Sequence, residues 1–221
     1  MTVRVGLATI DRVPIPSRRE ALAVLVGLRP AARLVRHSAA VAEIATYLAA
    51  CIAERGIKID RRLTESAALL HDMDKALPKS DPLLALGHGH AGAQWLRGHG
   101  FAELAPAVDG HPVSRLADDD HWRVWSRAAS LEERVVAYAD KRAAQRLGSM
   151  DKRFARWERR HPEYHERLSK ARARASILER DVCAAAGIAP ADVRRRRWVA
   201  TIQQRSGEPR AETEADEPMA P

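Results

Sequence analysis

Imidazoles and carboxylates that stand within apolar stretches are the residues of this sequence best suited to chemistry. His37 lies inside an apolar segment, His71-Asp72 ends an apolar run, and Asp140 directly follows another. Buried polar groups of this kind need partners, and one divalent cation can satisfy imidazoles and carboxylates together. We therefore predict that His37, His71, Asp72 and Asp140 converge from separate helices on a shared metal ion.

Two basic residues lie close to these predicted ligands in the sequence. Lys75 is four residues after His71, so on a helix it returns to the same face. Arg36 directly precedes His37, and for Arg36 a surface ion pair is an equally good interpretation. A cationic side chain beside a bound metal ion can hold a substrate phosphate. The pattern indicates metal-assisted chemistry on a phosphate.

Composition and helix punctuation indicate how these residues are positioned. The chain is rich in Ala, Leu, Arg and Glu and only 5% aromatic, which favours an all-α fold. Capping boxes begin at Ser17 and Ser130, and Pro or Gly residues mark most helix ends. We expect helices over about 17–29, 30–55, 60–77, 83–97, 101–108, 130–147, 149–160, 162–186 and 190–204. Residues 117–127 have no sustained period and are predicted to be a loop or an irregular helical excursion.

The length of 221 residues suits one catalytic core with a helical appendage. Cys51 and Cys183 belong to no CxxC pair, so neither a disulfide framework nor a thiolate metal site is indicated. The sequence contains neither an export signal nor an apolar run of about 18 residues that would span a membrane. We therefore expect a cytoplasmic protein without membrane insertion.

Positive charge is concentrated near the C-terminus. Residues 151–205 contain 15 basic against 7 acidic side chains. Such an excess can attract nucleic acid, but in an arginine-rich helical segment a solvated face with internal ion pairs is the favoured interpretation. The last residues, 206–221, are polar, acidic and proline-bearing, so we expect them to be disordered.

The ordered set His37, His71-Asp72 and Asp140 resembles the signature of the HD-domain superfamily of metal-dependent phosphohydrolases. The surroundings are similar too, in Arg36-His37-Ser38, in the segment 69–75 and in Tyr138-Ala139-Asp140-Lys141. The resemblance covers about residues 17–150. It implies an α-helical bundle, dependence on a divalent metal, and hydrolysis of phosphomonoester, phosphodiester or phosphoanhydride bonds, often in nucleotides.

Further site residues are implied by this resemblance alone. HD proteins with two metals have two more histidines, which His88 and His111 match, and Asp72 would then bridge the ions. Fe or Mn is the expected metal, with Mg, Co, Ni or Zn as alternatives. The resemblance makes Asp72 and Lys75 catalytic, and His90 joins Arg36 and Lys75 as a candidate substrate contact. One departure is Asp74, which stands where the family commonly has Gly and would either orient His71 or cap a helix end.

The sequence leaves three functions open. The favoured one is a two-metal phosphohydrolase acting on a phosphorylated small molecule, in particular a nucleotide. The second is a one-metal HD-type nucleoside monophosphatase, in which His88 and His111 contact substrate. The third is an RNA-binding or interaction module with a structural metal site. We expect an N-terminal extended segment (1–16), a catalytic helical domain (17–150), basic C-terminal helices (151–205) and a tail (206–221), and a homo-oligomer is compatible with all three functions.

Overall fold

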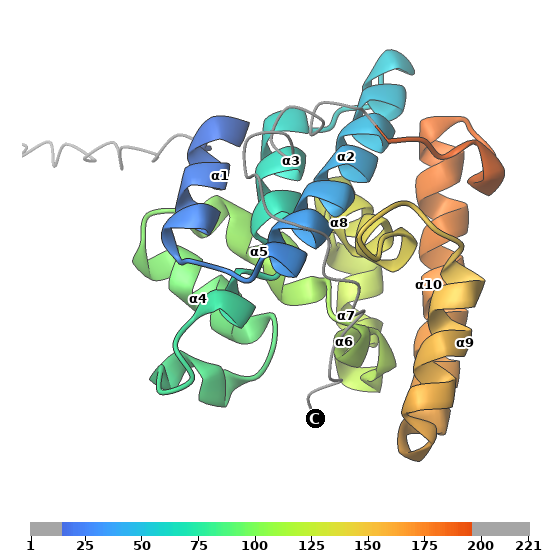
Figure 1. The fold of residues 1–221 in the computed structure, drawn as a ribbon. Helices are drawn as coiled ribbons and strands as arrows, with labels where there is room; N and C mark the ends of the chain where they lie inside the picture. Colours follow the sequence, from blue (N-terminus) through green and yellow to red (C-terminus); the bar gives the residue numbers. More distant parts are fainter. Residues whose placement is uncertain (1–14, 196–221) are drawn as a thin grey trace, which may run out of the picture.

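The computed structural model describes residues 15–195, and this part of the chain is all-α, which confirms the predicted fold class (Figure 1). The α-helices are α1 (Arg18–Gly27), α2 (Ala32–Glu54), α3 (Arg61–Leu70), α4 (His90–Gly98), α5 (Ala105–Gly110), α6 (Val113–Ala117), α7 (Asp119–Ala128), α8 (Leu131–Arg142), α9 (Met150–Arg160) and α10 (His165–Ala186). Short 3-10 turns are η1 (Met73–Ala76), η2 (Pro82–Leu86), η3 (Ala102–Leu104), η4 (Pro162–Tyr164) and η5 (Pro190–Asp192). No helix of residues 15–195 is both long and apolar enough to cross a membrane.

Local caps account for where the main helices begin and end. At the start of α1, the Ser17 hydroxyl accepts from the Glu20 amide, and the Glu20 carboxylate accepts from the Ser17 amide at 2.6 Å. Ser130 and Glu133 make the same reciprocal pair at the start of α8. Both predicted capping boxes are therefore confirmed. Helix α10 ends at Gly187, whose φ of 67° is the left-handed conformation that glycine adopts without strain.

Helix α2 is the centre of the bundle. It packs against α3, α8 and α10, and its residues Val41, Ile44 and Leu48 are fully buried. Helix α3 contacts α1, α5 and α8 as well. In Figure 1, α1, α3 and α2 run side by side, with α8 against α2. Because α2, α3 and α8 are mutual neighbours, side chains from all three can meet at one point.

The C-terminal helices pack against this bundle and against each other. Helix α10 contacts α2, α6 and α8, and α9 lies along α10 in Figure 1. Several of their basic residues form ion pairs within the fold. Arg172 pairs with Asp151 and Glu158, and Arg174 pairs with Asp119. The proposed division into a catalytic domain and basic C-terminal helices stays a prediction.

Of the two alternatives predicted for residues 117–127, a loop or an irregular helical excursion, the loop is wrong, because most of this segment forms the helix α7. Its N-cap is Asp118, whose carboxylate accepts from the amides of Asp120 and His121 at 2.9 Å each. Acidic residues in the first turn also suit the positive end of the helix dipole. Trp125 is 8% exposed, and a Cβ atom added at Gly110 would clash with its indole nitrogen, so glycine permits this close approach.

Three other predicted helices differ in their boundaries. Helix α3 ends at Leu70, and the expected helix 83–97 is divided into η2 and α4 around Gly87 and Gly89, both with positive φ. Helix α8 ends at Arg142 rather than at Gly148. The predicted N-terminal segment up to residue 14, the end of the predicted helix 190–204 and the predicted tail lie outside the described residues.

Candidate metal centre

Three helices bring the first four predicted ligands together. His37 comes from the first half of α2, His71-Asp72 directly follows α3, and Asp140 lies near the end of α8. The Nε2 atom of His37 lies 3.1 Å from His71 Nε2, 3.3 Å from Asp72 Oδ2 and 3.2 Å from Asp140 Oδ1. Among these residues, His37, His71 and Asp140 form a group whose ligand atoms all lie within 4.8 Å of one another. This spacing is compatible with a common divalent ion.

A second group forms around the other oxygen of Asp72. His88, at the turn before α4, places its Nε2 atom 3.2 Å from Asp72 Oδ1. His111, directly after α5, places its Nε2 atom 3.3 Å from the same oxygen and 3.2 Å from His88 Nε2. Asp72 therefore presents Oδ2 to one group and Oδ1 to the other. The structure brings together all six residues that the sequence proposed as metal ligands.

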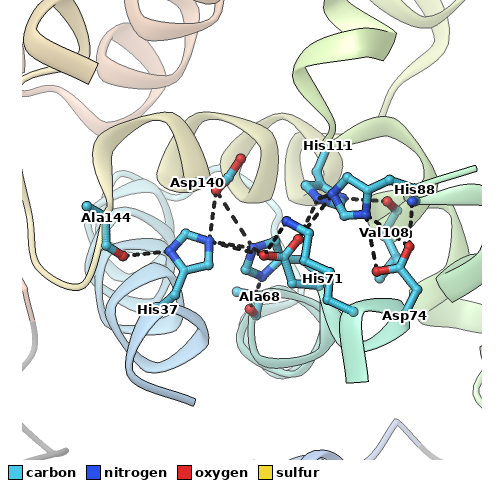
Figure 2. A network of polar contacts seen from close by, with 12 residues as sticks. His37, Ala68, His71, Asp74, His88, Val108, His111, Asp140 and Ala144 are labelled. Atoms are coloured by element: carbon cyan, nitrogen blue, oxygen red, sulfur yellow. Dashed lines mark hydrogen bonds and ion pairs between the residues drawn. The ribbon is translucent and has the colours of Figure 1, made fainter. Parts of the chain in front are cut away.

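The other ring nitrogen of each histidine is held by an acceptor. The Nδ1–H groups of three rings donate to backbone carbonyls, from His37 to Ala144 at 2.6 Å, from His71 to Ala68 at 2.8 Å and from His111 to Val108 at 2.6 Å (Figure 2). Because a carbonyl only accepts, Nδ1 of each ring carries a proton, and in the neutral ring the Nε2 lone pair faces the centre.

The directions and chemical types of these donor atoms indicate whether the residues suit a metal ion. His37 and His71 bring their Nε2 atoms close to each other and to carboxylate oxygens, an arrangement that positive charge stabilises, whether a proton on His37 or a bound metal ion supplies it. Imidazoles oriented by carbonyl acceptors are also the usual environment of metal-binding histidine. The donor set of nitrogen and carboxylate oxygen suits Mn, Fe, Co, Ni or Zn.

Asp74 accepts from His88 Nδ1 at 2.9 Å and from the Gly89 amide at 2.8 Å. The expectation that Asp74 orients His71 is therefore wrong, because His71 Nδ1 uses the Ala68 carbonyl. Asp74 is 2% exposed and takes the place that a backbone carbonyl takes for the other three rings. The close-up in Figure 2 shows this pair at the opposite end of the network from His37 and Asp140.

Burial and neighbouring charges set the ionisation of the centre. Burial alone would raise the pKa of the Asp140 carboxyl, but the cations of Lys141 and Arg153 hold that pKa well below its usual range. Burial lowers the pKa of His111 to about 3, so its ring is neutral, as a metal ligand requires. Both groups are thus in the protonation state that binds a cation.

The predicted substrate contacts occupy different places. Lys75 donates from Nζ to Asp72 Oδ2 at 3.0 Å and is 26% exposed, so it borders the centre. Arg36 donates to the Gln145 side chain at 2.8 Å, in the segment after α8. His90 is 44% exposed and pairs through Nδ1 with Asp109 at 2.7 Å. The roles of these three residues stay predictions.

Two cations at the centre were not assigned a role from the sequence. Lys141 is fully buried, forms an ion pair with Asp140 and donates to the His111 carbonyl at 2.8 Å. Arg153, from α9, lies 3.4 Å from Asp140 Oδ1. Lys141 is adjacent to a predicted ligand, which was a usable signal, whereas nothing in the local sequence distinguishes Arg153 from the other arginines of this segment.

Comparison with known proteins agrees with this geometry. The family model described as HD domain matches residues 34–145, which span His37 to Asp140. An uncharacterized protein of Methanocaldococcus jannaschii is 31% identical over 113 residues, which are 48% of this chain and 64% of that protein. The chain thus covers less than two thirds of this relative's length. No solved structure gives a significant match.

Proposed function

We propose that this chain, which belongs to the HD-domain family of metal-dependent phosphohydrolases, hydrolyses a phosphoester or phosphoanhydride bond of a nucleotide at a centre of two divalent ions. The observation that carries the proposal is the position of Asp72, whose two carboxylate oxygens face two separate groups of histidines. A carboxylate in this position suits a bridge between two ions. We place the reaction in the cytoplasm, as expected from the composition.

The residues of the chain would have different roles in this reaction. Bound ions supply Lewis acidity toward the phosphate and lower the pKa of a water molecule. His37, His71 and Asp140 would hold one ion, and His88 and His111 the other, with Asp72 shared. Lys75, already beside Asp72, would bind a phosphate oxygen through its ammonium group. Carbonyl acceptors hold the rings of His37, His71 and His111 so that their Nε2 atoms face the position where an ion would be held.

Metal removal tests the proposal. Treatment with a chelator should abolish hydrolysis of p-nitrophenyl phosphate and of nucleotides, and Mn or Fe should restore it. The chelated protein should also unfold at lower temperature, since an ion at 100 times its dissociation constant stabilises the folded state by about 2.7 kcal/mol. Turnover that persists after complete removal of metal, checked by elemental analysis, would contradict the proposal.

A one-metal phosphatase is the second candidate, because His37, His71 and Asp140 already form a compact group without His88 or His111. The two candidates differ in how much metal a His111→Ala variant retains. With two ions, we expect the content to fall from near two to near one per chain, because His111 Nε2 lies at the second group.

Elemental analysis after gel filtration measures this content. His99→Ala is the matched control, because His99 is exposed and stacks on Trp95 at 3.6 Å between ring centroids, with its Nδ1 on a helix carbonyl. A content near one per chain in the wild type, unchanged in His111→Ala, would replace the two-metal centre with the one-metal site.

A further inference from the structure

Arg153 brings a positive charge to the centre from outside the matched HD residues. It belongs to α9, whereas the family match ends at residue 145. Its Nη2 atom lies 3.4 Å from Asp140 Oδ1, the same oxygen that His37 Nε2 approaches at 3.2 Å. The side chain is 13% exposed. An arginine of the C-terminal helices therefore stands at the edge of the ligand cluster.

The position of Arg153 is fixed by packing. The next residue, Phe154, is fully buried, and Trp157 is 5% exposed and meets Phe154 edge to face at 5.1 Å between ring centroids. The Arg153 guanidinium lies over the Trp157 ring at 4.7 Å from its centroid, a cation–π contact that limits its movement. Helix α9 also contacts α8, which carries Asp140. Contacts within the protein thus hold the guanidinium in place before a substrate binds.

Neutralising Asp140 does not require a second cation, because Lys141 already forms an ion pair with the other Asp140 oxygen from a fully buried position. Among the described residues of the centre, and with neutral imidazoles, three carboxylates face three cations. These groups are Asp72, Asp74 and Asp140 against Lys75, Lys141 and Arg153. Each divalent ion that binds then adds two positive charges, and Arg153 repels that ion unless an anion accompanies it.

We propose that Arg153 binds the substrate's phosphoryl group and, with Lys75, selects a group that carries two negative charges, such as a phosphomonoester or a terminal phosphate, over a singly charged phosphodiester. This inference rests on the proposed function. A guanidinium matches the geometry of two phosphate oxygens, and a charge-rich centre of this kind favours the anion with the larger charge.

Binding of inorganic phosphate to the manganese-loaded protein tests the inference without turnover. We expect Arg153→Met to weaken phosphate binding by about tenfold to a hundredfold, as for loss of a hydrogen bond to a charged group, in isothermal titration calorimetry. Manganese affinity should stay the same or rise, because a cation is removed from the centre. Arg153→Lys should recover part of the phosphate affinity.

Arg172→Met is the matched control, because Arg172 on α10 pairs with Asp151 and Glu158 and is 37% exposed. It should leave phosphate binding unchanged. If Arg153 only supports Asp140, Arg153→Met will instead weaken manganese binding and leave the phosphate affinity of the loaded protein unchanged. That result would overturn the inference.

Measurements of turnover distinguish a failure of this inference from a failure of the proposed function. In the wild type, p-nitrophenyl phosphate should be hydrolysed with a higher kcat/KM than bis-p-nitrophenyl phosphate, and Arg153→Met should raise KM for the monoester more than it lowers kcat. A wild type that prefers the diester would contradict the inference while leaving the hydrolase intact. A wild type that hydrolyses neither these esters nor nucleotides would contradict the proposed function, whatever phosphate binding shows.

Discussion

Replacing Asp72 with Asn should lower kcat/KM by more than about 100-fold and remove most of the bound metal. The outer partners of metal ligands already contribute 10- to 100-fold to affinity or activity, and a shared ligand should contribute more. The amide keeps the shape of the side chain but offers one neutral oxygen in place of two anionic ones. Both groups of histidines face that carboxylate, at 3.2 to 3.4 Å from its two oxygens.

Asp120→Asn makes the same chemical change at a position where we expect no effect on metal content or kcat/KM. Asp120 is 88% exposed and pairs with Arg123 on the same helix. Elemental analysis and steady-state kinetics of both variants, at matched folding by circular dichroism, give the comparison. Full metal content together with unchanged kcat/KM in Asp72→Asn would show that Asp72 is not a metal ligand.

The sequence predicted the elements whose signals are local. Capping boxes at Ser17 and Ser130 require only residues three apart, and Gly187 ends α10 through its own backbone. His37, His71, Asp72 and Asp140 could be named because histidine and aspartate within apolar runs are unusual, whereas His88 and His111 were named from the family resemblance. Their proximity in space is a finding of the structure, and their role as ligands stays a prediction.

Features that depend on tertiary contacts could not be predicted from the sequence. The sequence suggested that Asp74 either orients His71 or caps a helix end, but the fold turns its carboxylate toward His88, 14 residues later. Trp125 of the short helix α7 is buried beside Gly110, which leaves room for its ring, and the local sequence does not encode this contact between two segments. Arg153 reaches Asp140 because α9 contacts α8 in the fold, and no spacing along the chain encodes that approach.

A second large effect is expected at Lys141, whose replacement with Met should make folding strongly dependent on metal. In the metal-free protein, loss of one partner of a buried ion pair typically costs about 3–5 kcal/mol of unfolding free energy. Lys141 is fully buried against Asp140, and its loss also leaves the His111 carbonyl without this donor. We expect the melting temperature of the chelated variant to fall well below that of the chelated wild type.

Manganese should then restore much of this stability, because a divalent ion beside Asp140 supplies the missing positive charge. Removing the lysine also removes a cation that repels the ion, so we expect the variant to bind manganese about tenfold more tightly, which corresponds to about 1.4 kcal/mol of additional stabilisation by metal. Thermal unfolding of wild type and variant, each with chelator and with saturating manganese, measures the stability lost without metal and the stability that manganese restores.

Lys170→Met is the control for removal of a lysine from an ion pair. Lys170 is 45% exposed and pairs with the exposed Asp119, so its loss should cost less than about 1 kcal/mol and should cost the same with and without manganese. If Lys141→Met is equally destabilising in both conditions, then Asp140 does not share its charge with a metal ion, because an ion on that carboxylate would necessarily compensate for the lysine. The argument for a cation at this end of the centre would fail with that result.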